Sequence, residues 1–140
     1  MPELPEVETV RRGLTAVMEG RRIMAVDVRR RDLRIPVPEN FADALVGRTV
    51  VRLGRRGKYL VFELDDGMVL LAHLGMSGRM LIDRPETGKP GVIGRHAHTT
   101  GPGSTHEHIV FEVGNGTLIR FRDPRRFGLM TLTRKEDLAT

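Results

Sequence analysis

Hydrophobic residues recur at helical spacing near the start of the chain, with polar residues between them. They are Val7, Val10, Leu14, Val17 and Met18. This spacing places them on one face of a helix, Pro5 suits the first helical turn, and Gly20 follows the expected end. The pattern predicts a helix over residues 5–18. A second, shorter helix is predicted over residues 39–46, where Gly47 ends it.

Most of the remaining chain shows the short apolar runs of β-strands. One run covers residues 23–34, with Met24, Val26 and Val28 on one predicted face. Further runs cover residues 49–53, 59–64, 68–74, 109–113 and 117–122. The turn Gly114-Asn115-Gly116 is typical of a hairpin because Asn and Gly accept positive φ. We therefore expect an α+β fold, a two-layered antiparallel β-sandwich or flattened barrel, with the N-terminal helix at one edge or end.

The predicted elements form one domain. Residues 83–105 are rich in Gly, Pro, Thr and His and are expected to form an exposed loop, too long for a hairpin turn. No boundary precedes Thr133, so the prediction is a single domain over 1–133. Residues 134–140 are expected to begin an interdomain linker.

Charge and composition narrow the classes of function. The chain has 23 basic and 18 acidic residues, and all but three of the basic ones are arginine. Arginine binds phosphate oxygens through two donors at once, so nucleic acid is the first partner to consider. The absence of cysteine excludes a disulfide framework and a thiolate nucleophile in this chain. No long apolar run or signal sequence is present, so we expect an intracellular, cytoplasmic protein.

Two His-x-His pairs raise the question of a metal site. They are His96 with His98 and His106 with His108. On a strand such pairs share a face, but no third ligand with suitable spacing follows, and the expectation is that no metal binds.

The N-terminal Pro2-Glu3 pair carries possible chemistry. Removal of Met1 would expose Pro2 as a secondary amine, which titrates near pH ~8 and can attack an aldehydic carbon. Glu3 beside it could move protons. The other interpretation is a disordered end of the chain.

Three further segments combine charge with glycine or an aromatic ring. Residues 55–59 suit either phosphate binding or a solvated turn. Residues 73–78 place Met76 either at a loop tip or in a gap-filling core position. Residues 120–128 carry arginines and Phe127 after an Asp-Pro turn. They suit insertion into a base stack, or a basic turn whose ring folds into the core.

In this order, the segments resemble the N-terminal domain of bacterial formamidopyrimidine-DNA glycosylase. The resemblance rests on Pro-Glu-Leu-Pro-Glu-Val-Glu-Thr at 2–9, Gly-Lys-Tyr-Leu at 57–60, His-Leu-Gly-Met-Ser-Gly at 73–78 and Asp-Pro-Arg-Arg-Phe-Gly at 123–128. The His-Glu-His-Ile run at 106–109 also resembles a strand entry of the family. The likeness extends over the whole chain.

The resemblance implies an enzyme of DNA repair. Such enzymes excise 8-oxoguanine and formamidopyrimidines from damaged double-stranded DNA and then cleave the strand by β,δ-elimination. By resemblance, Pro2 is the nucleophile, Glu3 the general acid and base, and Lys58 the group that assists elimination and binds phosphate. The DNA-contacting and void-filling residues are His106, Met76, Arg125 and Phe127, with Glu6 and His73 in supporting positions.

The chain also departs from the family. Members are longer and carry a helix-two-turn-helix domain and a cysteine-ligated zinc finger, which this sequence lacks. The family zinc therefore has no site here, no cofactor is expected, and the 140-residue fragment is expected to be inactive alone. A monomer is expected. Two alternatives stay open: a non-catalytic basic module that binds DNA, and an endonuclease VIII-like glycosylase for oxidised pyrimidines.

Overall fold

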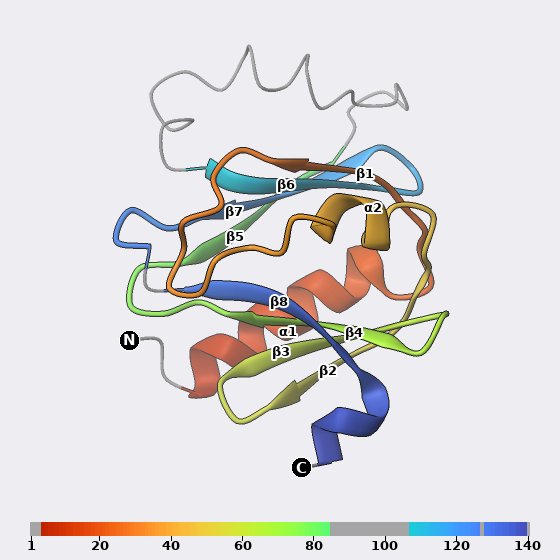
Figure 1. Cartoon of the computed structure of the whole chain (residues 1–140), viewed down its shortest axis with the longest axis horizontal. Coiled ribbons are helices and arrows are strands. Elements are labelled where there is room, and N and C mark those ends of the chain that lie inside the picture. Colours follow the sequence, from red (N-terminus) through yellow and green to blue (C-terminus); the bar gives the residue numbers. More distant parts are fainter. Residues whose placement is uncertain (1–3, 85–106, 127, 140) are drawn as a thin grey trace.

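Two four-stranded antiparallel sheets face each other and form the body of the molecule (Figure 1). The computed structural model describes residues 4–84, 107–126 and 128–139. Strand order is β1-β6-β7-β5 in one sheet and β2-β3-β4-β8 in the other. The strands are β1 (Ile23–Val28), β2 (Val50–Arg56), β3 (Tyr59–Leu64), β4 (Met68–His73), β5 (Arg79–Asp83), β6 (Glu107–Val113), β7 (Thr117–Arg122) and β8 (Leu129–Arg134). The helices are α1 (Leu4–Met18), α2 (Phe41–Leu45) and the 3₁₀ helix η3 (Lys135–Ala139). The predicted two-layered α+β fold is confirmed.

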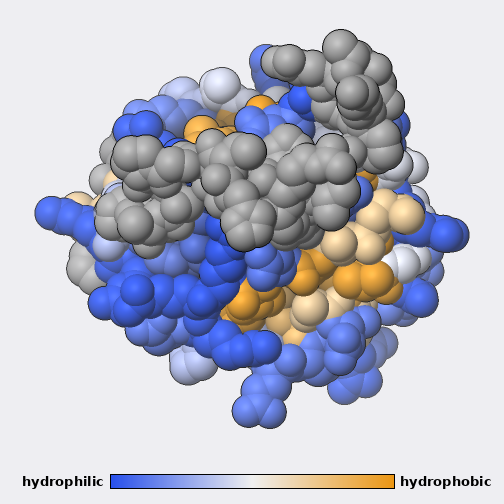
Figure 2. Space-filling model, turned by 90° about the horizontal axis from the view of Figure 1, so that it is seen from above, coloured by the Kyte–Doolittle hydropathy of each residue, from blue (hydrophilic) through white to orange (hydrophobic). Residues whose placement is uncertain are grey.

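The core lies between the two sheets. Large side chains from both layers are fully buried there, among them Leu60, Phe62, Leu70, Phe111 and Phe121. Helix α1 adds its predicted apolar face, of which Val7, Leu14, Val17 and Met18 are buried. Helix α2 adds Phe41, whose ring meets that of Phe111 edge-on at 6.4 Å between centroids. Seen from the β1-β6-β7-β5 side, the described surface is mostly hydrophilic around an apolar area (Figure 2).

Helix α1 covers the free edge of β2. The guanidinium of Arg11 donates to the carbonyl oxygen of Leu53 at 3.3 Å, and the carboxylate of Glu19 accepts the Leu53 N–H at 2.9 Å. Side chains of the helix therefore take the place of a neighbouring strand at this position. Such coverage protects an edge from pairing with another chain. The expected packing of the helix against an edge is confirmed.

Some predicted boundaries are wrong. The strand predicted over residues 23–34 ends at Val28. The prediction that Met24 shares a face with Val26 and Val28 is also wrong. A bulge between Ile23 and Ala25 shifts the register, so that Ile23 is buried and Met24 is 50% exposed. Strand β2 continues three residues past the predicted end at Leu53, to Arg56. Strands β5 and β8 were not predicted at all.

The end of the described chain packs against the second sheet. Residues 134–139 comprise the last residue of β8 and then η3. The Nζ of Lys135 lies 2.9 Å from a carboxylate oxygen of Glu63 on β3, and Arg56 donates to the carbonyl oxygen of Leu138. None of the described helices is both long and apolar enough to cross a lipid bilayer.

Candidate functional site

Three turns and the start of α1 gather at one end of the sandwich (Figure 1). The turns connect β2 with β3, β4 with β5, and β7 with β8, and they carry Lys58, Met76 and Arg125 respectively. The segments that sequence analysis singled out separately therefore meet at one end of the fold.

Asp123 ties two of these turns together. Its side chain is fully buried, and its Oδ1 accepts the hydroxyl of Ser77 at 2.6 Å. Its Oδ2 accepts the N–H of Gly128 at 2.7 Å. The Ser77 oxygen in turn accepts the N–H of Arg125 at 3.2 Å. A carboxylate that accepts hydrogen bonds from both turns holds them at a set separation.

Met76 and Arg125 project side by side from the joined turns. The Nη1 of Arg125 lies 3.7 Å from the sulfur of Met76, and Met76 is 49% exposed. The core interpretation of Met76 is therefore wrong, and the loop-tip interpretation is confirmed. An exposed thioether beside a guanidinium offers an apolar group and a charge to the same ligand.

Glycine is required where these turns approach other backbone. A Cβ at Gly78 would lie 2.2 Å from the carbonyl oxygen of Leu74. A Cβ at Gly128 would lie 2.7 Å from the carbonyl oxygen of His73 and 2.9 Å from Asp123 Oδ2. The glycines of both motifs thus let the turns close up against β4 and against Asp123.

His73 is buried at the end of β4, and its surroundings keep it neutral. Burial lowers its pKa below the ordinary value, and the positive charges of Arg34 and Lys58 lower it further. Its Nδ1 accepts the N–H of Gly75 at 3.0 Å, so the neutral ring carries its proton on Nε2. The ring of Tyr59 packs edge-on at 4.9 Å between centroids. His73 is therefore a fixed hydrogen-bond donor near Lys58.

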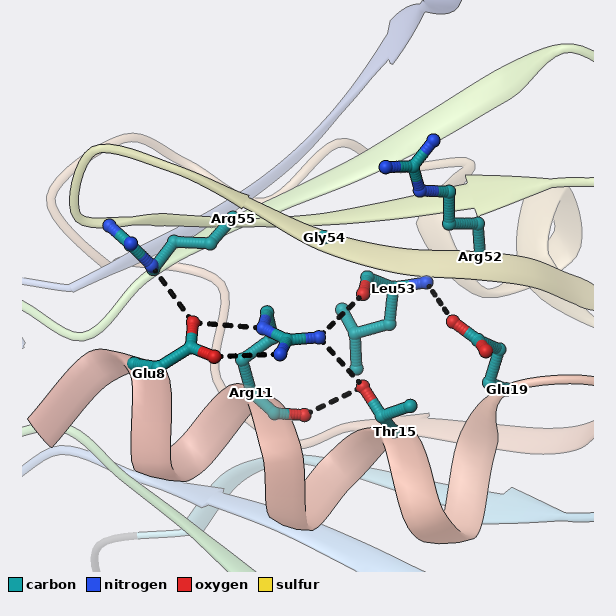
Figure 3. Close-up of a pocket in the computed structure, with 8 residues that line it drawn as sticks. All are labelled: Glu8, Arg11, Thr15, Glu19, Arg52, Leu53, Gly54 and Arg55. Atoms are coloured by element: carbon teal, nitrogen blue, oxygen red, sulfur yellow. Dashed lines mark hydrogen bonds and ion pairs between the residues drawn. The ribbon is translucent and has the colours of Figure 1, made fainter. Parts of the chain in front are cut away.

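The β2–β3 turn, which carries Lys58, is bonded to α1 through Arg55. Arg55 donates to the carbonyl oxygen of Gly57 at 2.9 Å. It also donates to the Oε1 of Glu8 at 3.1 Å (Figure 3). Glu6 lies in the first turn of α1 and is exposed. The start of the helix and the Lys58 turn are thus held on the same side of the molecule. The sequence motifs include Glu8, Arg55, Ser77 and Asp123 but assign none of them a role of its own, because their importance depends on partners distant in the chain.

Four predicted site residues lie outside the described residues: Pro2, Glu3, His106 and Phe127. The same holds for His96 and His98. His108 is described and fully buried, and its Nε2 lies 2.6 Å from the carbonyl oxygen of Asp123. Within the described ranges, no group of three or more His, Cys, Asp or Glu side chains is placed to hold a metal ion.

Comparison with known proteins places the chain in a family. The model of the family described as "Formamidopyrimidine-DNA glycosylase N-terminal domain" matches residues 1–130. The chain belongs to this family. The curated formamidopyrimidine-DNA glycosylase of Rhizobium johnstonii is 50% identical over 143 residues, which cover 100% of this chain and 48% of the relative. The enzyme of the same name from Afipia carboxidovorans is 52% identical over 140 residues, 99% of this chain and 47% of the relative.

Solved structures of a formamidopyrimidine-DNA glycosylase show the same fold. The protein of Lactococcus lactis in complex with DNA containing an abasic site superposes with a TM-score of 0.78 at 28% identity, covering 99% of this chain and 46% of that one. Its complex with DNA containing FAPY-dG gives a TM-score of 0.75 at 28% identity, covering 98% and 46%. The chain thus spans about half the length of the formamidopyrimidine-DNA glycosylases that it matches.

Proposed function

We propose that this chain is the chemistry-bearing half of a base-excision DNA repair enzyme, a glycosylase and lyase that acts on oxidised purines and formamidopyrimidines in double-stranded DNA. One observation carries the proposal: the Asp123–Ser77 link brings Met76 and Arg125 together at the end of the sandwich where Lys58 lies and α1 begins. The names of the curated relatives and the DNA lesions in the Lactococcus complexes support the same activity.

The proposed first step is nucleophilic. After Met1 is removed, the lone pair of the Pro2 nitrogen attacks C1′ of the damaged nucleotide, and the glycosidic bond breaks. The base leaves with the bonding electron pair and takes up a proton, and the Pro2 nitrogen loses its own proton. The lone pair of that nitrogen then expels O4′ from C1′, O4′ takes up a proton as the sugar ring opens, and Pro2 and C1′ are joined as an iminium. Glu3 supplies and accepts protons during these steps. A terminal amine with a pKa near ~8 is partly neutral at physiological pH, which this attack requires.

The proposed second step cleaves the strand. The iminium makes the C2′ proton acidic, and its removal expels the 3′ phosphate as the C–O bond breaks. A second elimination expels the 5′ phosphate, and attack of water on the iminium carbon frees Pro2. Lys58 assists these eliminations because its ammonium group stabilises the leaving phosphates. The steps use groups of this chain and no metal.

Extrusion of the damaged nucleotide leaves a gap in the base stack. In our proposal Met76, Arg125 and Phe127 fill that gap, with Arg125 facing the orphaned base and Phe127 wedged between bases. His106 contacts DNA, and Glu6 and His73 support the site. The exposed positions of Met76 and Arg125 suit this role.

The isolated 140 residues are proposed to be a monomer that binds DNA weakly and excises no base. Closure on bent DNA requires contacts on both sides of the duplex, and the relatives carry about as much chain again. Each missing phosphate contact also makes the plot of log binding constant against log salt concentration less steep, by about 0.9 in slope.

Borohydride trapping on lesion-bearing duplex tests the proposal. The chain extended to the length of its relatives should form a covalent complex, Pro2→Gly should weaken it, and retention of Met1 should abolish it. Undiminished trapping with Met1 in place would sink the assignment of Pro2. A module that only binds DNA would trap none at all, and preference for an oxidised pyrimidine over 8-oxoguanine would favour the endonuclease VIII-like alternative.

A further inference from the structure

Arg55 is bonded to helix α1 and to the turn between β2 and β3; Figure 3 shows its bond to Glu8 on α1. It is the next-to-last residue of β2, shortly before the turn that carries Lys58. Its Nε donates to Oε1 of Glu8 on α1 at 3.1 Å, and its Nη1 donates to the carbonyl oxygen of Gly57 at 2.9 Å. One planar guanidinium therefore joins the helix to the turn. A planar group with donors in fixed directions is suited to this, because binding one partner sets where the other must lie.

The Glu8 end of this connection is held firmly. Arg11 binds both carboxylate oxygens of Glu8, at 2.9 and 2.7 Å, and also donates to the carbonyl oxygen of Leu53 on β2. Hydrogen bonds from Arg11 and Arg55 hold the pKa of Glu8 far below its usual range. Glu8 therefore stays ionised at all pH values of interest and remains a strong acceptor for Arg55.

The bond from Arg55 to Gly57 constrains the backbone that leads into Lys58. Gly57 has φ +58°, the left-handed conformation that glycine adopts at low cost. Its carbonyl oxygen and the nitrogen of Lys58 belong to one planar peptide unit. A hydrogen bond to that oxygen therefore constrains the peptide plane that leads into Lys58, and with it the position of the Lys58 Cα atom.

We propose that Arg55 is a positioning residue that sets Lys58 relative to the start of α1. The inference rests on the proposed function, which puts the attacking amine just before that helix and makes Lys58 the partner in elimination. It assigns Arg55 no contact with DNA. Displacement of a reacting group by about 1 Å can reduce a rate about a hundredfold, so a connection of this kind affects chemistry more than binding.

Arg52 provides a matched control on the same strand. It is exposed, points away from α1 in Figure 3, and makes no ion pair within the described part of the chain. Arg52→Gln and Arg55→Gln remove the same charge from β2, so they separate a general loss of charge from loss of the connection. Arg55→Lys keeps the charge but lacks the fork, and it serves as the second variant if Arg55→Gln does not fold.

The first measurement needs no activity. Amide NMR spectra of the ¹⁵N-labelled chain should show that Arg55→Gln shifts the Lys58 amide and the amides of the first turn of α1, whereas Arg52→Gln leaves both in place. Unchanged Lys58 and α1 amides in a folded Arg55→Gln variant would overturn the inference.

The second measurement is borohydride trapping on single-stranded DNA with an aldehydic abasic site, together with strand cleavage, using the chain extended to the length of its relatives. At saturating DNA, Arg55→Gln should slow cleavage about tenfold or more, and Arg52→Gln should change only the DNA concentration needed. In a Lys58→Gln background, Arg55→Gln should reduce the cleavage rate hardly any further, because the ammonium group that Arg55 positions is already absent. The inference would be overturned if the losses of cleavage rate in the Arg55 and Lys58 variants were additive. It would also be overturned if Arg55→Gln changed only the DNA concentration needed. If the extended wild-type chain traps no DNA, the proposed function fails, and the amide spectra decide the inference by themselves.

Discussion

The carboxylate of Asp123 accepts the hydroxyl of Ser77 at 2.6 Å, although 46 residues separate them in the chain. This contact joins the β7–β8 turn to the β4–β5 turn. A second hydrogen bond joins them too, because the Ser77 oxygen also accepts the N–H of Arg125. The buried Asp123 thus controls two exposed side chains that it does not touch, Met76 and Arg125.

Asp123→Asn should weaken both this link and the fold. An amide nitrogen would face either the Ser77 hydroxyl or the Gly128 N–H in place of an acceptor, and an unsatisfied buried donor costs about 1–3 kcal/mol. We expect a lower free energy of unfolding in urea and slower excision from duplex DNA. Asp43 is an exposed carboxylate on α2, so Asp43→Asn removes the same charge without breaking a buried hydrogen bond and serves as the control. Equal stability of the two variants would show that the Asp123 bonds are dispensable.

Met76→Ala and Arg125→Ala should each impair excision from duplex far more than cleavage of a preformed abasic site in single-stranded DNA. Single strands contain no stack to repair, whereas unstacking in duplex costs a few kcal/mol. Phe127→Ala should behave in the same way. The comparison is made in single-turnover assays on the chain extended to the length of its relatives. Equal losses on both substrates would indicate misfolding in place of a lost wedge.

Gly78→Ala should be strongly destabilising, by about 2 kcal/mol or more, because its Cβ would lie 2.2 Å from the Leu74 backbone oxygen and the turn would have to move. Gly54→Ala is the matched control, since a Cβ there meets nothing within 4 Å. We expect it to be neutral or slightly stabilising. Thermal unfolding of both variants checks this, and similar melting temperatures would contradict the close approach.

Acidification should destabilise the fold through His73. Its pKa is lowered in the folded state, so the unfolded chain binds the proton more readily. Stability is therefore undiminished above the ordinary histidine pKa of about 6.5 and falls as the pH drops from there toward the folded-state pKa. In His73→Asn the amide oxygen can replace Nδ1 as acceptor for Gly75 without titrating. Urea unfolding between pH 7.5 and 5.5 should then show a smaller loss for the variant, and an equal loss would exclude His73 as the cause.

Local patterns in the sequence were sufficient for much of the fold. The face of α1 containing Val7, Leu14 and Met18 follows from helical periodicity alone, because residues three and four apart share a side wherever the helix packs. The hairpin between β6 and β7 follows from the positive φ that its turn requires, which Gly116 adopts at 91°. The exact Pro-Glu, Gly-Lys-Tyr-Leu, His-Leu-Gly-Met-Ser-Gly and Asp-Pro-Arg-Arg-Phe-Gly segments were enough to indicate the family.

Other features depended on the tertiary structure. Strands β5 and β8 lie at sheet edges, and whether such short segments pair depends on the strand beside them. The bulge that exposes Met24 depends on the register with β6. The bonds from Asp123 to Ser77 and from Arg55 to Glu8 join residues 46 and 47 positions apart. No local pattern encodes such pairs, because a hydrogen bond requires two atoms within about 3 Å and only packing of the two sheets and α1 sets that separation.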